Sequence, residues 1–296
     1  STPLYSSAAS DVYKRQSPHM PLILDIVKKR TPTWLPGVPT LYQKIMDAAE
    51  EKDVDLSGIR NAFSGAATLP VEIVERWETM TGGRLVEGFG MTETSPVLTA
   101  NPMNGKHRPG YVGVPFPDTQ VRIANPENLD ETQPDGQPGE MLARGPQIFQ
   151  GYFGNAAATE KTFHNGWFRT GDMALMEPDG YIKLVSRIKE IIITGGFNVY
   201  PAEVEEAIAQ HPDVVDVAAV GRPRQDGSED VVGCVTLRDG AVLDPEGLKE
   251  FCRERLTRYK VPRTFYHFED LARDNLGKIR RHQVRKDLLE LLEAKA

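Results

Sequence analysis

The sequence has almost no cysteine, and no segment of it is long and apolar enough to cross a membrane. Its two cysteines, Cys234 and Cys252, are separated by eighteen positions, and no histidine cluster accompanies them. That spacing fits neither a zinc site nor a disulfide framework, so we expect two reduced thiols in a cytoplasmic protein. No apolar run approaches the roughly 20 residues that a membrane helix needs, which predicts a soluble chain.

An excess of positive charge is also lacking. The chain has 35 Lys and Arg against 42 Asp and Glu, a formal net charge of −7. Because phosphate neutralisation dominates nucleic-acid affinity, this balance argues against a general nucleic-acid binder. The charge is uneven, however: residues 253–287 hold eleven Lys and Arg and five Asp and Glu, a local +6 that leaves −13 for the rest. This basic stretch is either a solvated face or a docking surface for a phosphate-bearing ligand.

The composition is that of a globular protein, with 40% hydrophobic and 26% charged residues, and 296 residues suffice for two domains. Residues 1–16 lack an initiating Met, an apolar targeting segment and any clear periodicity. We therefore expect them to be a disordered leader or a sequence artefact.

Three patterns follow one another along the rest of the chain. After helices at 22–30 and 40–50, residues 59–97 predict the strand, glycine turn and helix succession of an α/β sheet, whose strand ends bind ligands. Short β segments separated by Pro and Gly predict a β-rich subdomain over 109–185. The remainder predicts a small α+β unit, with helices at 202–210, 245–256 and 280–292 and strands at 214–220 and 231–237. The expected domains are 17–188 and 189–296.

Gly88-Phe89-Gly90-Met91-Thr92-Glu93-Thr94 places a hydroxyl and a carboxylate beside a glycine turn. Glycine permits close approach of the backbone to a ligand, Thr92 can bond a phosphate oxygen, and Glu93 can hold Mg²⁺, which prefers carboxylate and phosphate ligands. Taken alone, the segment is more typical of a turn in which a threonine caps a helix.

Three further segments carry candidate groups. Asp172 follows an aromatic strand, where its carboxylate could accept two ribose hydroxyls, and Arg187 ends the next hairpin; a surface salt bridge is the alternative for either. Gly195-Gly196-Phe197 forms a glycine turn that leads into a helix. Lys278 stands on a glycine turn before a basic helix, where a mobile ammonium could stabilise developing negative charge or simply be a surface cation.

Together and in this order the segments resemble the acyl-adenylate-forming (AMP-binding) superfamily, and within it the C-terminal part of the long-chain fatty-acid–CoA ligases. The resemblance runs from about Pro21 to the C-terminus. Its motifs are GVPTLY, FSGAATLP, GFGMTETSP, GEMLARGPQIFQGY, GWFRTGDM, SRIKEIIITGGFNVYPAEVE and YKVPR followed by LGKIRR. It implies a partial α/β large domain with a β-rich subdomain, followed by a small α+β lid domain.

The resemblance also implies residue roles. The nucleotide would be bound by Gly65, Ala66, Ala67, Glu87, Gly88, Phe89, Gly90, Met91, Thr92, Asp172 and Arg187. Lys278, Thr92 and Glu93 would be catalytic, with Glu93 the ligand of Mg²⁺. Lys189 would lie at the hinge between the domains, and the Gly195, Gly196 and Phe197 turn would line the path of CoA.

The implied reaction has two steps. A fatty acid attacks the α-phosphorus of ATP, which releases pyrophosphate and leaves an acyl-adenylate; the CoA thiol then attacks the acyl carbon, and AMP leaves. The C-terminal domain would rotate about Lys189 between the steps, withdrawing Lys278 and bringing in the 195–197 turn. A lipid substrate would also be compatible with peripheral association with the inner membrane.

One family element is not found in the sequence. Neither 64–68 nor 6–10 has the glycines and lysine of the loop that cradles the β- and γ-phosphates of ATP. We therefore expect the chain alone to be truncated and to have little or no ligase activity. Two alternatives stay open: an enzyme that transfers the acyl group to a carrier protein, and a non-catalytic nucleotide- or partner-binding fragment.

Overall fold

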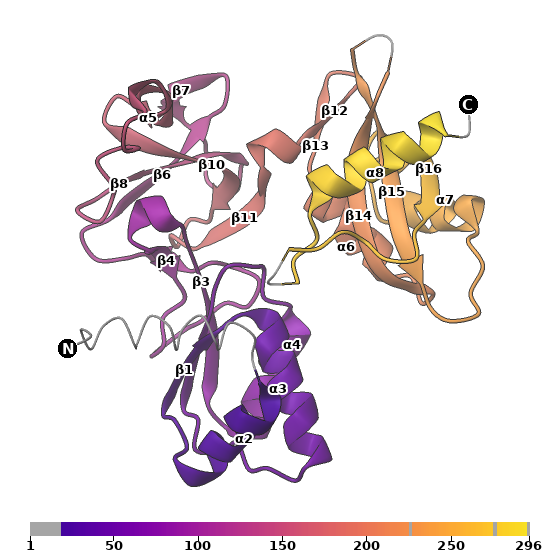
Figure 1. Ribbon diagram of the computed structural model, residues 1–296. Helices are drawn as coiled ribbons and strands as arrows, with labels where there is room; N and C mark the ends of the chain where they lie inside the picture. Colours follow the sequence, from indigo (N-terminus) through magenta and orange to yellow (C-terminus); the bar gives the residue numbers. More distant parts are fainter. Residues whose placement is uncertain (1–18, 225–226, 275–276, 295–296) are drawn as a thin grey trace, which may run out of the picture. The chain divides into compact units, whose positions relative to one another are not determined.

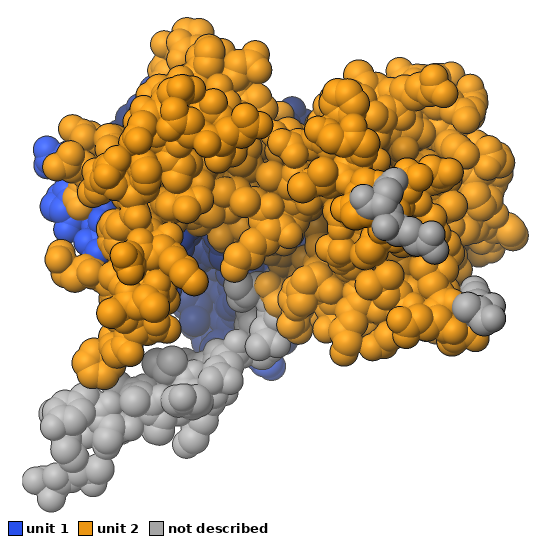
Figure 2. All heavy atoms as spheres, turned by 90° about the horizontal axis from the view of Figure 1, so that it is seen from above, with its two compact units in different colours: residues 1–119, 146–149 blue, residues 120–145, 150–296 orange. Residues whose placement is uncertain are grey.

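The computed structural model describes residues 19–224, 227–274 and 277–294. The predicted leader, 1–16, lies outside the described residues. Two compact units make up the chain: one holds the residues up to 119 together with 146–149, and the other holds 120–145 and 150–296 (Figure 2). The boundary predicted near Lys189 falls inside the second unit and stays a prediction. No helix among the described residues is long and apolar enough to cross a membrane.

The first unit is an α/β structure, as predicted. Its elements are α2 (Met20–Lys29), β1 (Trp34–Gly37), α3 (Pro39–Glu51), β2 (Asn61–Ser64), α4 (Val71–Thr81), β3 (Arg84–Gly90), η1 (Thr92–Thr94), β4 (Val97–Ala100) and β5 (Val114–Pro115). The strands form one sheet in the order β1-β2-β3-β4-β5. The first three strands are parallel, so their carboxyl ends lie at one edge of the sheet, next to the predicted glycine turns.

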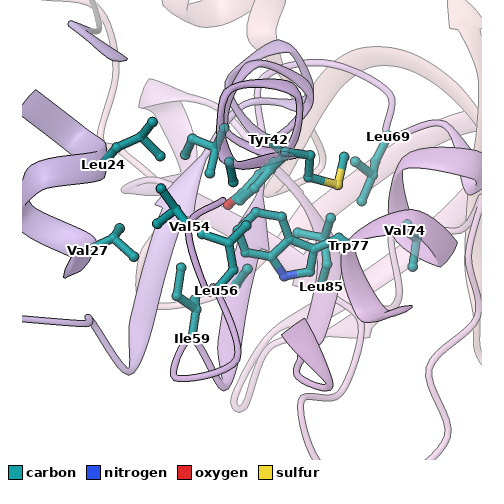
Figure 3. Packing of buried hydrophobic residues seen from close by; sticks show 14 residues of the cluster. Leu24, Val27, Tyr42, Val54, Leu56, Ile59, Leu69, Val74, Trp77 and Leu85 are labelled. Carbon is teal, nitrogen blue, oxygen red and sulfur yellow. The ribbon is translucent and has the colours of Figure 1, made fainter. Parts of the chain in front are cut away.

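An apolar core under the helices holds this sheet in place. The Tyr42 ring meets the Trp77 indole edge-on at a centroid distance of 4.9 Å, and both side chains are fully buried (Figure 3). The Tyr42 hydroxyl lies 2.9 Å from the carbonyl oxygen of Leu35 and 2.8 Å from that of Phe63. One side chain of α3 thereby joins β1 to β2, and the buried hydroxyl is satisfied.

The second unit begins with a β-rich subdomain, also as predicted. Its elements are β6 (Gln120–Asn125), β7 (Asn128–Thr132), β8 (Gly139–Arg144), α5 (Ala156–Thr162), β9 (Phe163–His164), β10 (Trp167–Met176) and β11 (Ile182–Arg187). The sheet order is β11-β10-β8-β6-β7, and β9 pairs with β10. The central strand β10 carries the WFRTGD motif.

The rest of the second unit is the predicted α+β structure (Figure 1). Its elements are η2 (Ile188–Glu190), β12 (Ile192–Thr194), β13 (Phe197–Val199), α6 (Pro201–Ala209), β14 (Val214–Pro223), β15 (Glu229–Leu237), α7 (Pro245–Arg253), β16 (Thr264–His267) and α8 (Arg281–Glu293). The helix expected over 245–256 ends at Arg253, three residues early. Proline in the first turn, where no backbone N–H is needed, begins α2, α3, α6 and α7.

The sheet β14-β15-β16 is covered on both faces, which explains why its strands are almost continuously apolar. Alternate residues of β14 belong to two separate cores. Val217 and Ala219 pack with α6 and α7, whereas Ala218 and Val220 pack with Leu288 of α8. Cys234 and Cys252 are free thiols, as predicted, and both are buried. Burial raises the pKa of the Cys234 thiol to about 12.

Candidate nucleotide site

The predicted Gly65-Ala66-Ala67 turn begins where β2 ends. The Gly65 N–H donates to the carbonyl oxygen of Gly37, the last residue of β1, at 3.2 Å. Ala66 has a φ of +69°, a left-handed conformation that a non-glycine residue adopts only where the surrounding chain holds it. A methyl group on Gly65 would be 3.9 Å from the carbonyl oxygen of Gly88, so the turn lies beside β3.

The predicted Glu87–Gly90 segment is the end of β3, and it leaves no room for side chains at two of its positions. A Cβ atom on Gly88 would lie 2.3 Å from Cζ of Phe63, and one on Gly90 would lie 1.8 Å from the carbonyl oxygen of Pro96. Phe89 between them is half-buried. These glycines are therefore required by the packing of the first unit itself.

Glu87, the first residue of this segment, is buried. Its Oε1 accepts a hydrogen bond from the Leu69 N–H at 3.2 Å, and burial raises the pKa of the carboxyl to about 8. Desolvation outweighs the single hydrogen bond to the ionised form, so Glu87 is mostly protonated at neutral pH. It acts as a buried hydrogen-bonding group that ties the 65–70 loop to β3.

The two threonines of the GMTET segment have different tasks. The hydroxyl of the buried Thr94 accepts the Met91 N–H at 3.0 Å and lies 2.9 Å from the carbonyl oxygen of Pro96, so it holds the short η1 helix together. Thr92 is exposed on the same helix, and Glu93 beside it is half-buried. The capping role that the sequence left open for a threonine thus falls to Thr94, and Thr92 remains the candidate ligand.

Two hydroxyls that sequence analysis missed lie next to this site. Ser64 pairs with Glu87 in the sheet and Thr99 pairs with Phe89, and both side chains are buried. Neither Ser64 Oγ nor Thr99 Oγ1 has a hydrogen-bond partner among the described residues. Unpaired buried hydroxyls have no sequence signature, because serine and threonine alternate with apolar residues in many strands.

In the second unit, Asp172 and Arg187 form an ion pair between neighbouring strands. They face each other in the β10–β11 ladder, and Arg187 Nε lies 2.9 Å from Asp172 Oδ1. Asp172 is only 5% exposed, and its second oxygen, Oδ2, has no partner among the described residues. Burial raises the pKa of Asp172 to about 6, against the lowering effect of the Arg187 and Lys278 charges. This is a buried acceptor beside a fixed cation, not the surface salt bridge that the sequence left open.

Asp172 lies inside a strand and not after one, contrary to the sequence prediction. Gly171 has a φ of +72°, and the β8–β10 register is irregular between Arg169 and Met173. Such an irregularity redirects side chains along a strand. The glycine in RTGD is therefore the local cause of the carboxylate's placement.

Lys278 is brought into the same electrostatic environment from the far end of the chain. Its N–H donates to Asp274 Oδ1 at 3.0 Å, its carbonyl oxygen accepts the Asp274 N–H at 2.9 Å, and Gly277 has a φ of +84°. The side chain is exposed, and its charge is one of the two that lower the pKa of Asp172. The structure therefore brings Asp172, Arg187 and Lys278 together within the second unit.

Gly195 and Gly196 form the two-residue turn of the β12–β13 hairpin, with φ of +56° and +83°. Both positions require a left-handed backbone, which is why glycine occupies them. Phe197 is exposed and stacks on Tyr259 at a ring distance of 4.7 Å. Tyr259 and Thr194 line a cavity of about 280 Å³, which is also lined by Arg224, Lys249, Arg253, Arg258 and Arg263.

The predicted hinge residue, Lys189, is exposed in the middle of the η2 turn. It stands between Arg187, which is paired with Asp172, and Glu190, which is paired with Arg281 at 2.6 Å. That it acts as a hinge stays a prediction.

Comparison with known proteins places the chain in the AMP-binding enzyme family. Residues 1–153 match that family, and residues 203–278 match the AMP-binding enzyme C-terminal domain. Among curated relatives, the long-chain-fatty-acid–CoA ligase of Bacillus subtilis is 39% identical over 267 residues, covering 90% of this chain and 48% of the relative. The corresponding ligase of Escherichia coli is 37% identical, covering 89% of this chain and 46% of the relative. The chain thus spans about half the length of these relatives.

Solved structures agree on the fold. ATP-bound MatB from Rhodopseudomonas palustris is 32% identical with a TM-score of 0.84, covering 93% of this chain and 54% of that one. The O-succinylbenzoate coenzyme A synthetase of Bacillus subtilis in complex with AMP is 26% identical with a TM-score of 0.78, over 92% of this chain and 54% of that one. The predicted family and fold class are confirmed.

Proposed function

We propose that this chain binds the AMP moiety of ATP and belongs to an ATP-dependent acid–thiol ligase that converts a long-chain fatty acid into its CoA thioester. The observation that carries the proposal is Asp172 Oδ2, a buried carboxylate oxygen without a partner among the described residues, beside the Arg187 and Lys278 cations. A buried acceptor is costly unless a ligand satisfies it, and ribose hydroxyls are suitable donors. The similarity to long-chain fatty-acid–CoA ligases supports the substrate class.

In this proposal the first unit supplies the adenine and phosphate contacts. The 65–67 turn and the 87–91 segment lie side by side. Gly65, where an added methyl group would meet nothing closer than 3.9 Å, would let the backbone approach the base. Thr92, exposed at the start of η1, would donate to the α-phosphate. In the second unit Asp172 and Arg187 would hold the ribose.

The residues also fit a magnesium ion carried by the nucleotide. No cluster of three or more acidic, histidine or cysteine side chains able to hold a metal occurs in the described part of the chain. Mg²⁺ is commonly bound by one or two carboxylates with phosphate oxygens and water, so Glu93 alone is an adequate protein ligand. When bound there, the ion would neutralise charge on the phosphates of ATP.

Lys278 would act on the adenylation step. The fatty acid carboxylate attacks the α-phosphorus, the bond to the pyrophosphate oxygen breaks, and negative charge develops around the transferring phosphoryl group. An ammonium in this position stabilises that charge electrostatically. The exposure of Lys278 and its turn at Gly277 suit a side chain that withdraws after the step.

The second step requires CoA, and the basic cavity next to the 195–197 turn supports this acceptor. Among the described residues, five Lys or Arg side chains and one acidic residue, Asp230, line the cavity. Such a surface attracts the phosphates of CoA, whereas the Phe197–Tyr259 stack offers an apolar surface for its pantetheine arm. We propose that rotation about Lys189 exchanges Lys278 for this turn between the two steps.

Nucleotide binding is tested with the chain as it is. Isothermal titration with AMP should detect binding by residues 1–296, and Asp172→Asn should weaken it at least tenfold. The matched control is Asp130→Asn, an exposed carboxylate on another strand of the same sheet, which should change the affinity less than twofold. Absence of AMP binding by a folded wild-type chain would refute the proposal.

The ligase activity needs the part of the relatives that this chain does not span. A chimera that joins the front half of the Bacillus subtilis ligase to this chain should release pyrophosphate from ATP in a fatty-acid-dependent way. Lys278→Ala should reduce the release at least a hundredfold, and Lys286→Ala on α8 should not. Supplying CoA or an acyl carrier protein as the acceptor decides which thiol is used.

A further inference from the structure

A network of charged side chains surrounds the η2 turn (Ile188–Glu190) on both sides. Before the turn, Arg187 Nε is held 2.9 Å from Oδ1 of the buried Asp172 on β10. After the turn, Glu190 Oε2 is held 2.6 Å from Arg281 Nη1 at the start of α8. Ile188 and Lys189 are the two residues between these ion pairs.

Arg281 is itself firmly anchored. Its Nε and Nη2 atoms form a two-pronged contact with Glu205 of α6 at 2.7 and 2.6 Å, and Glu205 Oε1 also accepts the Ala219 N–H from β14 at 2.9 Å. The side chains of Arg281 and Glu205 are 22% and 15% exposed. Two-pronged arginine–carboxylate contacts with little exposure are among the stronger ion pairs, and they fix orientation as well as distance.

A second contact reinforces the same arrangement one turn further along α8. Arg285 Nη2 lies 2.7 Å from Glu229 Oε1, and Glu229 Oε2 accepts the Ile193 N–H at 3.3 Å. Arg281 and Arg285 are four residues apart and therefore share a face of the helix. This face of α8 holds Glu190 directly and Ile193 through Glu229.

We infer that the Arg281–Glu190 ion pair holds the backbone in place on the lid side of the η2 turn. Backbone rotation between the two steps is then confined to Ile188 and Lys189, which we call the pivot. This inference rests on the rotation proposed above and identifies the residues that confine it. Asp172–Arg187 bounds the pivot on the other side. Because Arg281 follows Lys278 by three residues, the same anchor fixes the distance of the Lys278 turn from the pivot, and Arg281 is a positioning residue for Lys278.

The test is limited trypsin digestion of residues 1–296, with fragments quantified by mass spectrometry. Trypsin can cut after Arg187 and Lys189, and substitution of Arg281 leaves the sequence around both bonds unchanged. Arg281→Gln should accelerate cleavage after these residues at least fivefold while changing cleavage after Arg263, an exposed arginine of the same lid, less than twofold. Arg281→Lys should accelerate this cleavage to an intermediate degree, because one ammonium cannot contact two carboxylates in the geometry of a guanidinium. Lys286→Gln, which removes an exposed charge from the same helix, should have no effect.

The rate of cleavage after Arg187 and Lys189, divided by the rate after Arg263, shows whether Arg281 confines the pivot or stabilises the lid in general. Unchanged cleavage after Arg187 and Lys189 in folded Arg281→Gln would overturn the inference, and so would an equal acceleration after Arg263. If Arg281→Gln does not fold, Glu190→Gln, which keeps the Arg281–Glu205 contact, replaces it and is scored on cleavage after Arg187. The digestion needs no nucleotide, so a failure of AMP binding would refute the proposed function and leave this result standing.

Discussion

At the scale of single residues, the structure separates groups that have identical side chains. Thr92 and Thr94 are two positions apart, yet the Thr94 hydroxyl is hydrogen-bonded to the Met91 N–H and the Pro96 carbonyl, whereas Thr92 is exposed. Among the carboxylates, Glu93 is half-buried, whereas Glu87 and Asp172 are buried with raised pKa values. Burial alone does not distinguish Glu87 from Asp172, but their partners do. Glu87 accepts the Leu69 N–H, whereas Asp172 keeps one oxygen without a partner among the described residues.

The pKa of Asp172 predicts a pH-dependent cost to stability. Because folding raises this pKa from 3.8 to about 6, protonation of Asp172 favours the folded state. Its contribution to the free energy of unfolding is fully present below about pH 4 and is lost as the pH rises through 6. Asp172→Asn should therefore raise the free energy of unfolding by about 2–3 kcal/mol at pH 8 and by less than about 1 kcal/mol at pH 4. Chemical denaturation at both pH values measures this. A gain of equal size at the two values would show that the effect does not come from the charge.

At the scale of elements, the sequence predicted most of the long, periodic segments and missed most of the short ones. The helices α2, α3, α6, α7 and α8 and the strands β14 and β15 were expected near their observed bounds. The succession of β2, α4 and β3 and the β-rich character of the segment from β6 to β11 were expected from the punctuation of Gly and Pro. The missed elements are β1, β4, β5, β7, β9, β13, β16 and α5. Most of these span two to five residues, too few for a period to be visible, and they exist because a neighbouring strand provides hydrogen-bond partners.

The glycines of the first unit lead to a prediction at this scale. Gly90→Ala should destabilise the unit by more than about 2 kcal/mol, because the added methyl would lie 1.8 Å from a backbone oxygen that cannot move independently. Gly65→Ala is the matched comparison, since its methyl would meet nothing closer than 3.9 Å. It should leave the unfolding free energy within about 0.5 kcal/mol of wild type and weaken AMP binding about tenfold. Denaturation and calorimetry on both variants test this; equal losses of stability would contradict it.

At the scale of the whole molecule, the separate hydrophobic cores indicate which segments of the chain can fold independently. The core of the first unit includes residues from Leu24 to Leu85. Two cores cover the faces of the β14-β15-β16 sheet, and their buried residues run from Ile192 to Leu288. The segment after Lys189 thus has cores of its own within the second unit.

We accordingly predict that residues 189–296 fold without the rest of the chain. The fragment should show a cooperative thermal transition and should keep both cysteines unreactive toward a thiol reagent, because Cys234 and Cys252 are buried in its two cores. Residues 120–296 serve as the comparison with the entire second unit. A broad transition with immediate thiol labelling in the shorter fragment alone would show that the β-rich subdomain is needed for folding.

The sequence by itself determined the order of the motifs and the class of each domain, because apolar period, proline and glycine act over a few residues and are visible locally. The family followed from the resemblance of these ordered motifs to a known superfamily. The candidate residues Gly65, Thr92, Asp172, Arg187 and Lys278 were also found this way. Only the tertiary structure decided three further points: Asp172 is buried with one oxygen that has no partner within the described part of the chain, the Lys278 charge acts on it, and Arg281 holds Glu190. Desolvation and ion pairing depend on distances between residues far apart in the chain, and folding alone sets those distances.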